Sequence, residues 1–219
     1  MAERKSLLAK NALTTLEATM EFLGLDSADP DVLDLTKNNL ERLINAASSY
    51  IETMTGRKFG KQDYKEKHWG SGSQELCLEQ YPIIQVDRIT DLENAVDLSP
   101  DSYSISEYGE IGVLYRDEGW AERGYLAGLA DDMVSKKRYL LVSYTAGYVL
   151  PRDATDEEPA TLPYDLQYLV WQMVQQQWNL AANGANGLSA FSISDISWTF
   201  DKELSTQIKE IIGRYTRWA

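Results

Sequence analysis

The spacing of apolar residues changes from helical to strand-like and back to helical along the chain, and this change constrains the fold most strongly. Before Gly56, apolar residues recur every three or four positions, which predicts a long amphipathic helix. These residues are Leu40, Leu43, Ile44, Ala47, Ile51 and Met54. Short alternating runs follow, and helical spacing returns after Pro163. We therefore expect an α+β fold: a helical bundle of about four helices with a small, mainly antiparallel β-sheet inserted in the middle of the chain.

Three shorter segments complete the predicted helices. Thr14-Thr15-Leu16-Glu17 has the pattern of a capping box, which predicts that Thr14 caps a helix running to Gly24. Pro163 suits the first turn of a helix that continues to about Ala182, and a last helix should end at Trp218. We interpret residues 1–219 as a single domain with a helical part (1–60), a β-rich part (61–150) and a last part (151–219) holding a helix, an extended arm and the C-terminal helix.

In the middle of the chain, residues 62–69 and 74–79 flank a Gly-Ser turn and predict a hairpin. Four further strands are expected at residues 83–90, 103–106, 111–115 and 139–145. Residues 117–138 break the alternation, which predicts an exposed loop with a helical turn between 126 and 133. Residues 190–200 alternate again and indicate a strand or an extended arm.

The charge of the chain argues against free binding to nucleic acid. There are 21 basic and 34 acidic side chains, and the net charge of −13 is spread along the chain. An acidic surface repels the phosphate backbone. The lone Cys77 cannot form an internal disulfide, and the chain has no apolar run long enough to cross a membrane. We therefore expect a soluble protein that folds in the cytoplasm.

The residues do not indicate an active site. His68 is the only histidine, so no zinc site of His and Cys residues can form, and we interpret His68 as a surface or packing residue. Cys77 lies in an expected strand and should be at least partly buried. The segment 56–62 resembles a phosphate loop only superficially and is better read as a helix stop followed by a basic turn. We expect no catalytic residue, no metal and no cofactor, and therefore no enzyme.

Aromatic residues instead favour a role in assembly, because Trp, Tyr and Phe are enriched at protein interfaces. The segment 188–219 is rich in them, and we expect it to provide much of the contact with other subunits and to be removable from Lys202 onward without loss of the fold. The candidate interface residues are Phe191, Ile193, Ile196, Trp198, Phe200, Ile208, Ile212, Tyr215 and Trp218.

The order of several short segments resembles that of tailed-bacteriophage head-tail connector proteins, the adaptor or head-completion proteins that dock on the portal. The segments extend over nearly the whole chain. They are Ala12 to Glu17, Phe22 to Gly24, Leu43 to Ala47, Ile51 to Phe59, Gln80 to Ile83, Gly112 to Arg116, Val142 to Tyr148 and Leu162 to Leu166.

This resemblance implies a structural protein of the phage neck, made in the cytoplasm of the bacterial host. It implies a homo-oligomeric ring, commonly of twelve copies, beneath the portal protein and above a downstream neck or tail-completion protein. DNA would pass through the channel without specific binding. Two alternatives remain open at this stage: a tail-completion or terminator protein and, less favoured, a carboxylate-dependent metal enzyme.

Overall fold

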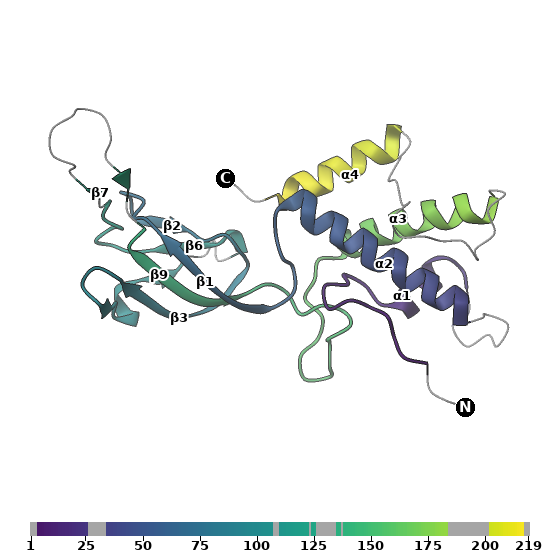
Figure 1. Ribbon diagram of the computed structural model, residues 1–219, viewed down its shortest axis with the longest axis horizontal. Helices are drawn as coiled ribbons and strands as arrows, with labels where there is room; N and C mark the ends of the chain where they lie inside the picture. Colours follow the sequence, from purple (N-terminus) through teal and green to yellow (C-terminus); the bar gives the residue numbers. More distant parts are fainter. Residues whose placement is uncertain are drawn as a thin grey trace. The chain divides into compact units, whose positions relative to one another are not determined.

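The computed structural model describes residues 4–25, 34–106, 110–122, 124–125, 135–136, 138–183 and 202–216. The chain divides into two compact units. The helical unit comprises Met1–Gly60 and Tyr148–Ala219, and the β unit comprises Lys61–Gly147. Helices from both ends of the chain thus belong to one unit, and the strands lie in the middle of the chain (Figure 1). This arrangement confirms the predicted α+β class, whereas the interpretation of the chain as a single domain stays a prediction.

Four α-helices build the helical unit within the described residues. They are α1 (Leu16–Phe22), α2 (Asp34–Thr55), α3 (Tyr164–Asn183) and α4 (Lys202–Tyr215). α2 packs against each of the other three helices (Figure 1). The apolar positions predicted for α2 face the core, where Leu40, Ile44 and Ile51 are fully buried. Exposed Met54 is the exception. Burial of one apolar stripe per helix therefore holds the unit together.

The ends of the helices follow local rules, with one correction. Gly56 has a positive φ of 66°, which confirms it as the glycine that ends α2. The prediction that Thr14 caps α1 is wrong: the Thr15 hydroxyl accepts the Ala18 amide hydrogen bond at 3.2 Å. Thr14 is fully buried, and its hydroxyl accepts a hydrogen bond from Trp171 Nε1 at 2.8 Å. Tertiary packing thus uses the first threonine and leaves the second for the cap.

The two larger antiparallel sheets of the β unit enclose a second core. The larger sheet has the order β1-β9-β3-β4, and the smaller has the order β2-β6-β5. The strands are β1 (Gln62–His68), β2 (Glu75–Cys77), β3 (Ile83–Asp91), β4 (Val96–Asp97), β5 (Ser104–Ile105), β6 (Val113–Tyr115) and β9 (Leu140–Ala146). β7 (Gly124–Tyr125) pairs with β8 (Ser135–Lys136), and η1 (Pro100–Ser102) is a short 3-10 helix. β9 therefore lies at the centre of the larger sheet.

The predicted hairpin of residues 62–69 and 74–79 is wrong. β1 pairs with β9, which lies far along the chain, and β2 pairs with β6. The Gly-Ser segment between β1 and β2 therefore joins two different sheets. Gly70 is required there, because a Cβ atom at this position would lie 1.8 Å from the Ala121 carbonyl oxygen. The glycine thus marks a close approach of two backbone segments.

Two further predictions about exposure are wrong. Trp120, which was placed in an exposed loop, is 1% exposed and packs in the core of the β unit. Cys77 is exposed, because Leu76 and Leu78 take the inward positions and alternation places Cys77 on the other face of β2. The helical turn expected within residues 126–133 and the arm expected at 190–200 lie outside the described residues.

None of the described helices is both long enough and apolar enough to cross a membrane.

Candidate assembly surfaces and internal anchors

An extended N-terminal segment lies along α2 and is held by a row of polar side chains. Asn45 binds the backbone twice: its Oδ1 accepts the Ala9 amide at 2.8 Å, and its Nδ2 donates to the Leu7 carbonyl at 2.8 Å. One helical turn further on, the Ser48 hydroxyl accepts the Leu13 amide at 3.0 Å. These positions recur at helical spacing on one face of α2. The helix therefore orders a segment that has no regular structure of its own.

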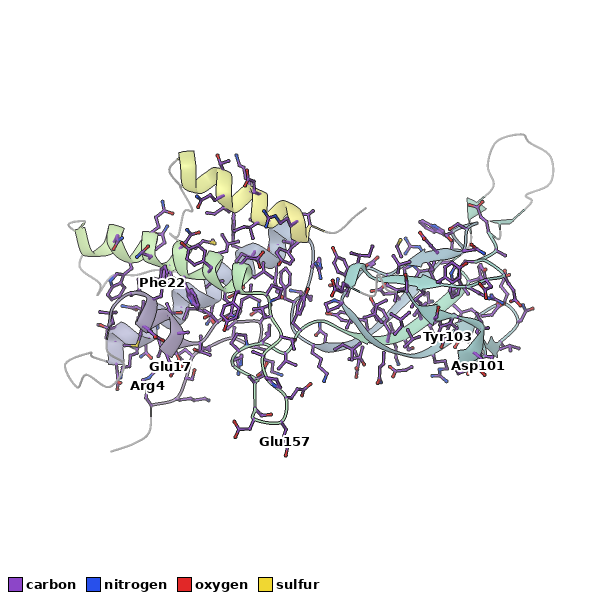
Figure 2. All side chains as sticks on the ribbon, turned by 180° about the vertical axis from the view of Figure 1, so that it is seen from behind. Arg4, Glu17, Phe22, Asp101, Tyr103 and Glu157 are labelled. Carbon is purple, nitrogen blue, oxygen red and sulfur yellow. The ribbon has the colours of Figure 1, made fainter. Side chains whose placement is uncertain are left out.

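Glu41 is the charged centre of this contact and is 1% exposed. Arg4 donates to both carboxylate oxygens, at 2.8 and 3.1 Å, and the Ser6 hydroxyl donates at 2.7 Å. Burial raises the pKa of Glu41, but the hydrogen bonds from Arg4, Ser6 and the Leu7 amide outweigh burial, so that the pKa lies below its usual value. Figure 2 shows Arg4 in this N-terminal segment. The ion pair thus fastens the start of the chain to α2.

The C-terminal helix α4 is anchored at its last turn by contacts that sequence reasoning did not predict. The buried Arg57 guanidinium donates to the Tyr215 carbonyl at 3.3 Å. The negative end of the helix dipole also favours a cation at this C-terminus. The Tyr215 hydroxyl donates to Asp165 Oδ1 at 2.7 Å. Burial, followed by the hydrogen bond to Asp165, raises the pKa of Tyr215. The expected basic turn after Gly56 is thus partly an internal anchor.

The predicted interface residues fall into two groups. Ile208 and Ile212 are 3% and 7% exposed and belong to the core of the helical unit, and the half-buried Tyr215 packs against it. The structure therefore contradicts the expectation that α4 is removable without loss of the fold. The other six lie outside the described residues: Phe191, Ile193, Ile196, Trp198, Phe200 and Trp218. The part of all nine in contacts with other subunits stays a prediction.

A hydrogen-bonded group in the β unit is centred on Glu66 and includes His68. His68 Nε2 lies 2.9 Å from Glu66 Oε2, which also accepts the Glu79 amide at 3.0 Å. The Tyr144 hydroxyl donates to the other oxygen of Glu66. Burial raises the pKa of Glu66, but the hydrogen bonds from His68, Tyr144 and the Glu79 amide hold it below its usual value. This group ties β1 to the turn after β2, and alternation along β1 could have indicated it.

Exposed apolar side chains occur on both units. In the helical unit, Phe22 stacks on Trp171 with ring centroids 5.5 Å apart and meets Tyr168 edge-on at 5.9 Å. Tyr168 is 44% exposed, and Tyr164, one turn before it, is 79% exposed. Exposed aromatic residues at helical spacing are typical of protein interfaces.

Potential metal ligands are not gathered in the described ranges, where no three His, Cys, Asp or Glu side chains form a group that could hold an ion. The fold and these surfaces define an α+β protein with an inserted antiparallel β unit, exposed aromatic residues and internal anchors.

The family model of head completion proteins matches residues 12–218 of this chain. The chain belongs to the head completion protein family. This finding confirms the resemblance that the order of sequence segments indicates. The comparison with curated proteins gives no match.

Two solved structures have a similar fold. One is the neck of an empty gene transfer agent (GTA) particle computed with C6 symmetry, which is 12% identical, with a TM-score of 0.52 over 99% of this chain and 95% of the other. The second is the neck of a native GTA particle computed with C12 symmetry, which is 15% identical, with a TM-score of 0.50 over 100% and 96% of the two chains. At these identities the likeness shows the fold. Together with the family, it supports the predicted structural role in a phage-type neck.

Proposed function

We propose that this chain forms a ring of twelve copies in the neck of a phage-type particle, beneath the portal protein and above a downstream neck or tail-completion protein. The family match over residues 12–218 is the observation that carries this proposal. The solved necks of similar fold, computed with C6 and C12 symmetry, support a ring, since a twelvefold ring also has sixfold symmetry. In such a ring each subunit uses two different patches, one for each neighbour.

The ring lines the channel through which DNA leaves the head. Each copy has a net charge of −13, so a ring of copies presents a strongly acidic surface. A polyanion gains little from such a wall, because affinity for DNA comes largely from basic side chains that displace counterions. The charge thus suits passage of DNA without specific binding.

Residues 188–219 provide much of the contact with neighbouring subunits and with the portal. Because Ile208 and Ile212 pack inward, α4 offers its exposed face, which includes Gln207 and Glu210, for these contacts. Aromatic side chains that become buried at an interface are common centres of binding energy.

Electron microscopy of the purified protein mixed with portal rings tests the proposal. We expect a second ring stacked on the portal ring. A double variant, Trp198→Ser with Phe200→Ser, should lose docking while its far-ultraviolet circular dichroism matches the wild type.

The exposed pair Lys5→Ala and Lys10→Ala is the matched control and should dock normally. Binding to tail-tube proteins without binding to portal rings would identify a tail-terminator protein instead. Failure to join any portal ring, or metal-dependent turnover of a substrate, would overturn the proposal.

A further inference from the structure

The larger sheet of the β unit carries opposite charges at its two edges. Paired residues in adjacent antiparallel strands lie on the same face, so the pairing defines rows across the sheet. One row runs from Lys67 on β1 through Leu141 on β9 and Thr90 on β3 to Asp97 on β4. β1 and β4 are the two edge strands. The row therefore begins with a cation at one edge and ends with an anion at the other.

The β1 edge has cationic side chains without internal partners. Lys65 and Lys67 are exposed, and both lie on the face of β1 that points away from the core of the β unit. Neither forms an ion pair with another residue in the described part of the chain. Trp69 continues the same alternation and is 44% exposed, with the Arg138 guanidinium 5.0 Å from its ring. This edge thus combines positive charge with an exposed aromatic ring.

The β4 edge is acidic and partly apolar. Asp97 accepts a hydrogen bond from the Thr90 hydroxyl at 2.6 Å and lies 3.8 Å from Arg88, while 52% of its side chain stays exposed. Exposed Asp101 follows in η1, and Figure 2 shows it beside Tyr103 at one end of the β unit. Val96 is 58% exposed but lies on the opposite face of β4 from Asp97. The two edges therefore match each other in charge.

We propose that the β1 edge of one copy binds the β4 edge of the next copy around the ring. The basic edge, Lys65 and Lys67 with Trp69, meets the acidic edge, Asp97 and Asp101. The contact joins two different patches of the same chain, which is the arrangement that a closed ring requires. This inference rests on the proposed function, since it assigns one contact within the proposed ring.

DNA is the less suitable occupant of the basic edge. Asp63 lies on the same face as Lys65 and accepts a hydrogen bond from the Thr145 hydroxyl at 2.8 Å, so the face is mixed in charge rather than uniformly basic. The β unit is also acidic as a whole, which disfavours a polyanion at long range. A small acidic surface on another copy, which contacts the lysines directly, is the better match.

Charge reversal tests the contact. The β1 variant carries Lys65→Glu and Lys67→Glu, and the β4 variant carries Asp101→Lys, which spares Asp97 and its hydrogen bonds. Each variant alone brings like charges together at every contact, so the protein concentration needed for ring formation on portal rings should rise about tenfold or more. An equimolar mixture pairs opposite charges at every contact of an even-numbered ring and should restore assembly.

Controls separate this inference from the proposed ring. Lys5→Glu with Lys10→Glu changes the net charge as much as the β1 variant does, at exposed positions outside the β unit, and should assemble like the wild type. Trp69→Ser should also weaken assembly. If the wild type forms rings and both edge variants do so at the same concentration, the edge contact is wrong and the ring stands.

Two other outcomes would also count against the contact. If the β1 variant assembles normally but binds duplex DNA less tightly than the wild type, the basic edge serves DNA instead. If the mixture fails to restore assembly, the two edges do not meet. If the wild type itself never assembles on portal rings, the proposed function fails.

Discussion

Ile208→Ala should destabilise the helical unit, because the structure makes α4 part of its core. Ile208 is 3% exposed and faces the core that α2 and α3 share with α4. The substitution removes three carbon atoms at about 0.8 kcal/mol each, or about 2.4 kcal/mol. The cavity left behind adds to this loss, so the free energy of unfolding should fall by about 2–4 kcal/mol.

Urea unfolding followed by far-ultraviolet circular dichroism measures this loss, because the helices of this unit dominate the signal. Lys209→Ala, at the next residue of α4, is the matched control, since Lys209 is exposed. It should change the free energy of unfolding by no more than about 0.5 kcal/mol. If the two variants unfold at the same urea concentration, α4 is not packed in the core and the anchoring role of Arg57 and Tyr215 is refuted.

Three other substitutions test separate parts of the structure. Gly70→Ala should lower the melting temperature of the β unit, because its Cβ would lie 1.8 Å from the Ala121 carbonyl oxygen; an unchanged near-ultraviolet melting curve would contradict this. Gly213→Ala should stabilise α4 by about 0.5–1 kcal/mol in urea unfolding, since a Cβ at this helical position meets nothing within 4 Å, and a loss of stability would show that the site is not open. The pKa of Glu41 is lower in the folded protein than in the unfolded chain. Its contribution to the free energy of unfolding is therefore complete above about pH 5 and is lost as the pH falls through the folded pKa. Glu41→Gln should therefore be less stable than the wild type at neutral pH, and the difference in their free energies of unfolding should become smaller in acid. A difference independent of pH would refute the stabilising role of the Glu41 carboxylate.

The β unit shows why strand positions and strand partners differ in predictability. Alternation located β1, β3, β6 and β9 within a few residues, because side chains of one strand alternate between its two faces. It did not show that β1 pairs with β9, which lies more than seventy residues away. The nearest candidate partner was β2, and a turn-like segment between two strand-like runs does not distinguish a hairpin from a passage between two sheets.

The candidate surfaces were even less predictable from the sequence than the pairing of the strands. Lys65 and Asp97 are ordinary charged residues in the sequence, and only the order of strands places them at opposite edges of one sheet. Likewise, the apolar face of α4 could be recognised from its spacing, but spacing alone did not decide whether Ile208 and Ile212 face this chain or another one. The structure places both in the core of the helical unit.

By itself, the sequence determined the α+β class, the approximate positions of the helices and strands, the end of α2 at Gly56 and the resemblance to connector proteins. These features depend on local spacing, backbone preference and the order of short segments, which can be recognised along a single chain. Only the tertiary structure decided which strands pair, why Arg57 is buried, why Cys77 is exposed and which side chains hold the N-terminal segment. These outcomes depend on contacts between residues far apart in the chain, and many arrangements of such contacts are compatible with one local pattern.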